Sequence, residues 1–446
     1  MQLSRRRFLG SMITLAAVGP LVAACSPAAA PTAAPTAAPA KSGEAPKPAE
    51  SKPAAPAANA LVYYTGLTGG DGDVMRNMVA KANGASKDFQ VNMEVMPWAD
   101  MFAKMVATMA AGNPLDVVLT HPYDSVSFLE QEAFLPVMDF LTPLGVKLDD
   151  FVASTVKGCT YNGMVYALPF DQFHPMMYVR TDIAKEAGVD VSKPPANMME
   201  FMDRAKKLTK KEGGKITVSG LGLDYPNPWG LALTAIHQNG GVVYTPDASK
   251  STINSPQAVE AVEWLLSLYD DVGASGAGAQ MDAVIKGVSA QAYGGPHWVP
   301  QMVRSVADKF DTYMMPTLFK QSAVGPGGNH CLVLTKQKDK TRIEQGAKFI
   351  KAISDDSLAW VEAGNLPAKK TIIESDEFKK IPYRKPLVDA IPVLTMYPNA
   401  RFYAELTSPT GAQRKNFEAI ISKQIGVKEG LAKMEKEINE VLSRPK

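Results

Sequence analysis

The sequence predicts an α/β fold for the region that begins at Leu61, and three observations support this. Short runs rich in β-branched and aromatic residues alternate with segments of helical spacing. Residues 89–95 alternate between apolar and polar side chains, which is the period of a strand with one buried face. Residues 101–109 carry an apolar stripe at helical spacing. Because strands and helices follow one another in turn, we expect a sheet with crossover helices and a ligand crevice at the carboxyl ends of its strands.

Local signals place the individual elements. The first strand is expected at 61–65, and a Gly-rich turn at 66–72 leads into a helix that ends near Asn83. Gly112-Asn113-Pro114 should stop the next helix, and a strand is expected at 115–120. A hairpin about Asn162-Gly163 and a strand at 176–180 should follow. The further elements expected are helices near 182–187 and 198–211, the second capped by Asn197 with Glu200, then a strand near 216–221 and a helix from Ser255-Pro256 to Tyr269.

Length and composition limit the architecture and the class of protein. A chain of 446 residues exceeds the ~100–200 expected of one domain, so two lobes are expected. With 46% hydrophobic and 21% charged residues, the composition is that of a folded soluble body and too polar for a multi-span membrane protein. The net charge is +2 with Lys and Arg interspersed among Asp and Glu, so capture of nucleic acid by a basic stripe has no support.

The first 25 residues have the pattern of an export signal. Arg5, Arg6 and Arg7 precede an apolar run from Met12 to Ala24, which is shorter than the ~20 residues that a membrane-spanning helix needs. The paired arginines before Phe-Leu indicate the twin-arginine route, although Gly10 leaves the general secretory route open.

Val22-Ala-Ala-Cys25 closes this signal and resembles a bacterial lipobox, in which Cys25 would be lipidated. A plain signal with a coincidental Cys is the alternative. Two further cysteines remain, Cys159 and Cys331. They could pair after export, but two buried thiols are the favoured interpretation.

Residues 26–59 are Pro, Ala, Ser, Thr and Lys almost without exception. Such a segment cannot form a core and is expected to be an extended linker. It would hold a globular body away from a membrane while keeping the body tethered.

From residue 60 to 443 the chain resembles the extracellular solute-binding proteins, family 1, of ATP-binding-cassette importers, the group that contains maltose-binding and glycerol-3-phosphate-binding proteins. The resemblance rests on short motifs in a specific order: Tyr63-Tyr-Thr-Gly-Leu-Thr-Gly, Ala111-Gly-Asn-Pro-Leu-Asp-Val-Val118, Tyr161-Asn-Gly-Met-Val-Tyr-Ala-Leu-Pro169 before Met177-Tyr178, Gly327-Gly-Asn-His-Cys-Leu-Val333, Ala347-Lys-Phe-Ile-Lys351 and Glu362-Ala-Gly-Asn-Leu-Pro367.

The resemblance implies a two-lobe periplasmic-binding-protein-like fold (type II), with lobes joined by crossing hinge strands near 168–174, 325–329 and 369. Lobe 1 would be residues 60–170 with 327–369, and lobe 2 residues 172–325 with 370–446. It also implies an exported, lipid-anchored monomer at the outer face of the cell membrane that has no cofactor, binds a sugar or polyol between its lobes and delivers it to the permease subunits of an importer.

Aromatic platforms for a sugar are expected near the cleft. Trp98 stands between a strand and a helix, where the resemblance places a ligand-lining aromatic residue, and packing into the lobe is its alternative role. Trp229 and Trp298 lie in Gly- and Pro-rich stretches that predict loops. Trp264 and Trp360 fall inside helical patterns and are expected in the core.

Polar groups for hydroxyls are expected on neighbouring loops. Gly69 and Asp71 lie where the first strand meets its helix, although a plain tight turn would explain them equally well. Asp171 at the first crossing could accept hydroxyl hydrogen bonds or cap a turn. Arg401 resembles a family position in the cleft, with a surface salt bridge as its alternative. The remaining candidates, which lie in the glycine-rich and family-like motifs, are Gly294, Gly328, Asn329 and Asn365.

Four of the five histidines fall in proposed cleft or crossing segments: His121, His174, His297 and His330. No HxxxH or HExxH motif occurs, so no metal site is expected. We instead hypothesise that one or two of these histidines donate hydrogen bonds to the solute and make its capture depend on pH.

Two other classes of function stay open beside solute binding. An anchored glycosidase would use two carboxylates, for which Asp171 with Asp71 or Asp224 could be nominated, but no recognised catalytic motif supports it. A structural adhesin is disfavoured because no internal repeat follows residue 60. The solute itself is not identified by the sequence, and a glycerophosphodiester remains an alternative to a sugar.

Overall fold

The computed structural model of the protein describes residues 59–112, 115–223, 227–273 and 280–445, all within the unit Ala55–Lys446. The predicted signal, Cys25 and nearly all of the predicted linker lie outside the described residues, as do Asn113, Pro114 and Asp224. Among the residues described, no helix has both the length and the apolar character to span a bilayer.

The first sheet has five strands in the order β2-β1-β3-β14-β6. β1, β2 and β3 run parallel, whereas β14 is antiparallel to both β3 and β6. The strands are β1 (Leu61–Thr65), β2 (Val91–Val95), β3 (Val117–Thr120), β6 (Ala167–Pro169) and β14 (Cys331–Leu334). The predicted sheet with crossover helices is therefore confirmed, and its parallel strands end at one edge.

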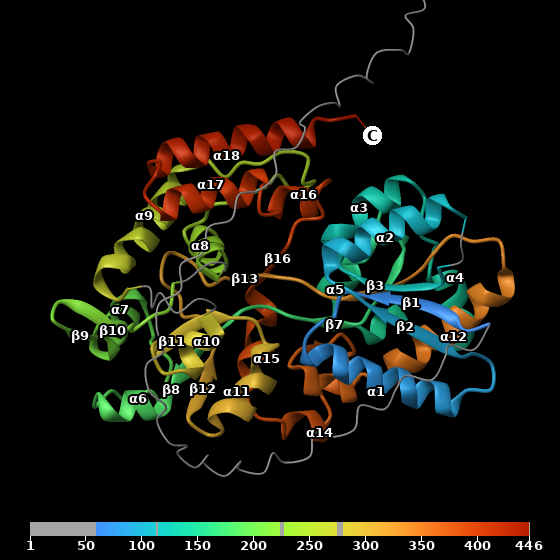
Figure 1. Ribbon diagram of the computed structural model, residues 1–446, viewed down its shortest axis with the longest axis horizontal. Coiled ribbons are helices and arrows are strands. Elements are labelled where there is room, and N and C mark those ends of the chain that lie inside the picture. Colours follow the sequence, from blue (N-terminus) through green and yellow to red (C-terminus); the bar gives the residue numbers. More distant parts are fainter. Residues whose placement is uncertain (1–58, 113–114, 224–226, 274–279, 446) are drawn as a thin grey trace, which may run out of the picture. The chain divides into compact units, whose positions relative to one another are not determined.

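Helices cover both faces of this sheet because its buried residues alternate between the two sides. Tyr63 and Val117 pack with the core under α1 (Gly70–Ala85) and α12 (Lys340–Asp355). Tyr64 and Val118 pack on the opposite face with Met101 and Met105 of α2 (Trp98–Ala110). Figure 1 shows α1 on one side of β1 and α2 with α3 (Pro122–Glu130) on the other. The smaller elements beside this sheet are α4 (Met138–Leu141), α5 (Ala153–Gly158) and the hairpin of β4 (Thr160–Tyr161) and β5 (Met164–Val165).

The second sheet has three antiparallel strands in the order β11-β8-β12, namely β8 (Met176–Arg180), β11 (Gln291–Gly294) and β12 (Phe310–Tyr313). Met177 and Val179 face a large core, whereas Met176 and Tyr178 face a smaller one with Trp298. The helices around this sheet are α6 (Thr181–Glu186), α7 (Met198–Leu208), α8 (Asn227–Gln238), α9 (Pro256–Asp271), α10 (Gln280–Ile285), α11 (Trp298–Val306) and α15 (Lys385–Ala390), with the hairpin of β9 (Lys210–Glu212) and β10 (Lys215–Val218).

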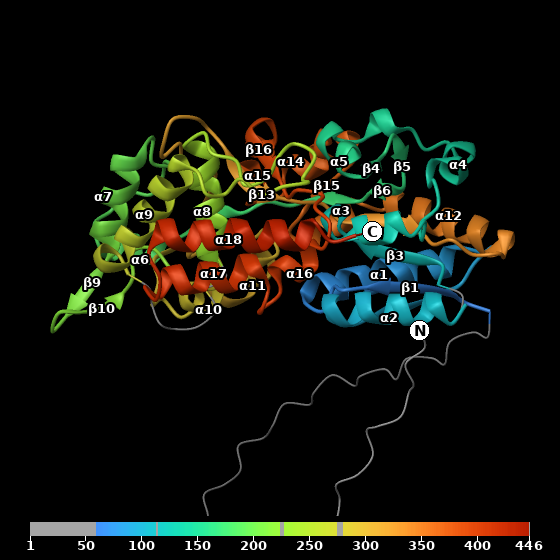
Figure 2. The ribbon, with the colours of Figure 1, turned by 90° about the horizontal axis from the view of Figure 1, so that it is seen from above.

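The C-terminal helices α16 (Tyr403–Thr407), α17 (Ala412–Ile421) and α18 (Val427–Leu442) add Phe417, Ile420 and Met434 to the large core of the second sheet. Figure 2 shows α17 and α18 lying side by side. Their buried residues recur every three or four positions, so one face of each helix is removed from water.

The chain passes between the two sheets through short paired segments. β7 (Asp171–Gln172) lies between β6 of the first sheet and β8 of the second and pairs with β15 (Leu366–Pro367). β13 (Val324–Gly327) lies between β12 and β14 and pairs with β16 (Leu394–Met396). Phe173 and Gly328 form a further bridge between two of these segments. The short helices α13 (Lys370–Ile373) and α14 (Asp376–Lys379) follow β15.

Most of the local predictions are confirmed within a few residues. The Asn197 side chain accepts a hydrogen bond from the Glu200 backbone N–H at 3.0 Å, and Ser255 caps α9 by accepting one from Ala258. The prediction of loops at Trp229 and Trp298 is wrong. Each residue stands at the start of a helix, in the first turn of α8 and at the first position of α11. Gly and Pro mark helix starts as well as loops, which explains the error.

Candidate functional site

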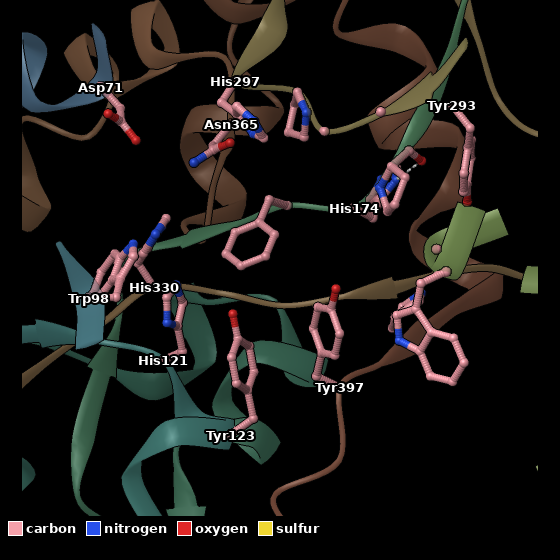
Figure 3. Close-up of a pocket in the computed structure, with 18 of the residues that line it drawn as sticks. Asp71, Trp98, His121, Tyr123, His174, Tyr293, His297, His330, Asn365 and Tyr397 are labelled. Atoms are coloured by element: carbon pink, nitrogen blue, oxygen red, sulfur yellow. Dashed lines mark hydrogen bonds between the residues drawn. The ribbon is translucent and has the colours of Figure 1, made fainter. Parts of the chain in front are cut away.

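A cavity of about 510 Å³ lies between the ends of the two sheets and is bounded by the connecting segments. Its volume falls in the range of about 300–1,000 Å³ that is usual for small-molecule sites. Figure 3 shows Trp98, His121 and His330 on one side of it, with His174 and Tyr293 on the opposite side. The lining residues are Leu67, Asp71, Trp98, His121, Tyr123, Phe173, His174, Pro175, Trp229, Gly230, Tyr293, Gly294, Gly295, Pro296, His297, Pro326, His330, Asn365 and Tyr397.

Trp98 begins α2 directly after β2 and offers an aromatic face to the cavity. Its ring stacks on that of His330, with centroids 5.8 Å apart, and lies 4.3 Å from that of His121. The indole also covers Gly66, where a Cβ would lie only 2.0 Å from the ring. Because any side chain there would displace the indole, Gly66 is the residue that lets Trp98 take this position.

Asp171 lies beneath the cavity, is fully buried and does not line it. Its Oδ1 accepts a hydrogen bond from the His330 backbone N–H at 2.7 Å. Its Oδ2 accepts three more, from Trp360 Nε1 at 2.7 Å, Asn365 Nδ2 at 2.8 Å and His330 Nδ1 at 2.7 Å. Four donors satisfy this buried carboxylate, as a charge removed from water requires. The role of Asp171 in the structure is to orient His330 and Asn365.

His121 is held in the same manner at the end of β3. Its Nδ1 lies 3.0 Å from Asp124 Oδ2, and its ring stacks on Tyr123 with centroids 4.7 Å apart. The His121 and His330 ring centroids are 4.8 Å apart. Burial lowers the pKa of His121 and outweighs the opposing effect of Asp124, so its imidazole is neutral at pH 7.

His174 and His297 complete the group of histidines. His174 Nδ1 lies 3.1 Å from the Pro175 carbonyl oxygen, and Nε2 lies 3.0 Å from that of Leu387. Two carbonyl acceptors favour the protonated ring, but burial is the larger effect and lowers the pKa of His174. Burial also lowers the pKa of His297, against the attraction of Asp71.

Asp71 supplies the carboxylate that lines the cavity on the side of the first sheet. Its Oδ1 accepts hydrogen bonds from the backbone N–H groups of Gly69 at 3.1 Å and Gly72 at 2.8 Å, so it caps the start of α1. Gly69 itself does not line the cavity.

Eight of the fourteen ligand residues expected from the sequence line this cavity, namely Asp71, Trp98, His121, His174, Trp229, Gly294, His297 and Asn365. The other six do not line it: Gly69, Asp171, Trp298, Gly328, Asn329 and Arg401.

The positions of three of these six correct the sequence-based expectation. The Trp298 ring packs against Tyr178 with centroids 5.2 Å apart, in the core beside the second sheet, and it covers Gly294. Arg401 forms an ion pair with Glu130 at 2.8 Å and donates to the Arg444 carbonyl oxygen. Asn329 is fully buried and donates to Cys159 Sγ at 3.4 Å.

Several lining residues were not anticipated, above all Tyr123, Phe173 and Tyr397. Tyr123 follows β3 directly in α3, so the rule that ligands meet the carboxyl ends of parallel strands could have found it. Tyr397 reaches the cavity only through the pairing of β16 with β13, for which the sequence gives no local signal.

Metal chemistry and thiol chemistry find no support around the cavity. Across the described ranges, no group of three or more His, Cys, Asp or Glu side chains could hold a metal ion. Cys159 and Cys331 are free and buried. Burial raises the pKa of Cys331 well above its usual value, as does the neighbouring thiol of Cys159.

Comparisons with known proteins agree with this geometry. A family model described as bacterial extracellular solute-binding protein matches residues 77–386. The sn-glycerol-3-phosphate-binding periplasmic protein UgpB of Escherichia coli (strain K12) is 22% identical over 181 residues, 39% of either chain, so the match spans well under half of that relative.

Solved structures match over nearly their whole length. T. maritima MalE3 with bound maltose has a TM-score of 0.73 at 20% identity, covering 85% of this chain and 99% of that one. A solute-binding protein of an ABC transporter from Thermotoga lettingae with bound α-D-tagatose has a TM-score of 0.74 at 16% identity, covering 86% and 99%. At these identities the likeness establishes the fold, a two-lobe arrangement.

Proposed function

The chain belongs to the bacterial extracellular solute-binding proteins, and from this membership we propose that it binds a carbohydrate in the cavity between its two sheets and delivers it to an ABC importer. The observation that carries the proposal is the make-up of the cavity wall. Aromatic side chains of Trp98, Tyr123 and Trp229 line the cavity together with polar groups such as Asn365. Aromatic rings cover the C–H faces of a sugar while polar side chains bind its hydroxyls.

The proposal includes two lobes that close on the solute. Lobe 1 would comprise residues 60–170 and 327–369, and lobe 2 residues 172–325 and 370–446. The position of the cavity between sheets joined by short crossing segments supports this division. Closure about these segments would bury the sugar and present a joint surface to the permease.

Export and anchoring belong to the same proposal. The family is extracellular, and the Val22-Ala-Ala-Cys25 motif supports lipidation of Cys25, with residues 26–59 as the tether. The paired arginines support the twin-arginine route. We propose a monomer without catalytic activity. Mass spectrometry of the membrane fraction tests the lipid, because a Cys25→Ala variant should lose both the acyl mass and the membrane attachment.

The test of solute binding is a thermal-shift screen of the purified protein against neutral mono-, di- and trisaccharides. A sugar at 100 times its Kd should stabilise the folded state by about 2.7 kcal/mol, a visible rise in Tm. Trp98→Ala should reduce the shift to about half or less, whereas Met199→Ala, whose residue is 76% exposed, should keep it. A protein that no carbohydrate stabilises would refute the proposal, and turnover of aryl glycosides would favour the glycosidase alternative.

A further inference from the structure

The hydrogen bonds beneath the cavity determine which polar atoms the wall offers to a solute. Asp171 Oδ2 accepts from Trp360 Nε1 and Asn365 Nδ2, and both of these nitrogens can only donate. This oxygen is therefore an acceptor, and His330 Nδ1 at 2.7 Å must carry the proton that it shares. Nδ1 is thereby engaged, so Nε2 is the His330 ring nitrogen left for the cavity.

The adjacent His121 ring is also held through its Nδ1. His121 Nδ1 donates to the Asp124 carboxylate, so Nε2 of the neutral imidazole is an acceptor. Burial keeps this imidazole neutral by lowering its pKa. His121 and His330 line the cavity side by side, with ring centroids 4.8 Å apart. The His121 ring therefore offers an acceptor to a solute, whereas a donated hydrogen bond was expected from the sequence.

Two further acceptors line the wall. Asn365 uses its Nδ2 on Asp171, which leaves its Oδ1 as the polar atom for the cavity. Asp71 uses Oδ1 to cap α1 and lines the cavity with its carboxylate. Figure 3 shows Asp71 and Asn365 in the same part of the site.

No Lys or Arg is among the described residues that line the cavity. Arg304 comes near Gly70, at 3.5 Å from where a Cβ would stand, but its guanidinium donates to Gln301 outside the lining. Neutral side-chain donors such as the Tyr123 hydroxyl also line the wall. An anionic group entering the cavity would meet a carboxylate and several acceptors without any fixed cation.

Resting on the proposed function, we propose that this cavity selects uncharged or amine-bearing carbohydrates and excludes phosphorylated ones, including glycerol 3-phosphate. Hydroxyl and ammonium groups donate to the His121 and Asn365 acceptors and to Asp71. A phosphate can only accept when it is fully ionised, so it loses its hydration and meets only neutral donors in return. The preference separates this chain from the curated relatives named for sn-glycerol 3-phosphate.

The test is a titration of the purified protein at pH 7.5 with matched probes. The probes are glucose, galactose and mannose, each also as its 2-amino and 6-phosphate derivative, together with glycerol 3-phosphate. For the hexose that binds, the neutral and amino forms should bind at least tenfold more tightly than the phosphate. A phosphate derivative or glycerol 3-phosphate that binds as tightly as the neutral sugars overturns the selectivity and leaves solute binding standing. A protein that binds no carbohydrate in this or the wider screen overturns the proposed function with it.

A variant pair separates selectivity from general damage to the site. Asp71→Asn retains a side-chain oxygen that can cap α1 but removes the charge. The affinity for the amino sugar relative to the neutral sugar should therefore fall several-fold, and the affinity for the sugar phosphate relative to the neutral sugar should rise. Asp73→Asn removes an acid on the same helix whose side chain is 78% exposed, and both ratios should stay at their original values. Equal ratios in Asp71→Asn and the original protein would overturn the role of Asp71, because a purely structural defect weakens all probes together.

Discussion

Replacing Asp171 with Asn should destabilise the protein, because no orientation of the amide satisfies the four donors around it. In the original protein the His330 backbone N–H lies 2.7 Å from Asp171 Oδ1 and donates to it. If the oxygen of the new amide points toward Trp360, Asn365 and the His330 ring, its nitrogen points toward this N–H. That contact leaves a buried donor without an acceptor, at about 1–3 kcal/mol, and the other three bonds lose the carboxylate charge. We expect the free energy of unfolding of Asp171→Asn to fall by about 3 kcal/mol.

Urea unfolding at pH 7.5, followed by tryptophan fluorescence, measures this difference. The midpoint should fall while the slope with denaturant stays the same, because the surface exposed on unfolding is unchanged. Asp73→Asn is the matched control, since loss of a charge from a side chain that is 78% exposed should change stability by less than about 0.5 kcal/mol. If Asp171→Asn costs less than about 1 kcal/mol, the hydrogen bonds do not hold His330 and Asn365 as described.

Three further predictions test other parts of the structure. Trp98→Ala should weaken sugar binding at least tenfold in calorimetry without a matching loss of Tm, and an unchanged Kd would remove the indole from the site. Burial lowers the pKa of His121, His174, His237 and His297 below the ordinary 6.5 of the unfolded chain, so the unfolded state binds more protons as the pH falls. The free energy of unfolding should therefore decrease from pH 7 toward pH 5.5. A flat profile, or one that is the same in His121→Gln, would contradict this. Arg342→Met should cost about 3 kcal/mol because it removes the cation paired with the buried Asp116 carboxylate, which keeps hydrogen bonds from Val62 N–H and Gln337 Nε2. Lys81→Met at an exposed ion pair should cost less than about 1 kcal/mol, and equal losses would refute the distinction.

The sequence predicts the elements whose signals are local. Alternation of apolar and polar residues in the sequence locates β2, and the capping residues Asn197 and Ser255 locate the starts of α7 and α9. These features depend on residues within a few positions of each other, so they can be read without knowing the fold. The starts of α8 and α11 were missed because Pro-rich segments occur both in loops and at the first turn of helices.

The candidate site is less predictable because its contacts join distant parts of the chain. Trp98 and His121 could be placed near the crevice because each follows a strand of the parallel part of the sheet. The sequence could not decide between a ligand contact and a salt bridge for Arg401, since its partner Glu130 is 271 residues away. Sequence pattern indicates where a side chain enters a site, but not which of its atoms are already occupied by other residues.

Asp171 links the crossing segments to the ligand site. It lies on β7, between the two sheets, and its donors come from segments 159 to 194 residues farther along the chain. Because four hydrogen bonds converge on one fully buried carboxylate, relative movement of these segments would leave donors unsatisfied at about 1–3 kcal/mol each. We therefore expect any bending on solute binding to occur in residues on either side of this cluster. His330 and Asn365 would then keep their orientation while the lobes move, so both side chains are in place before the solute binds.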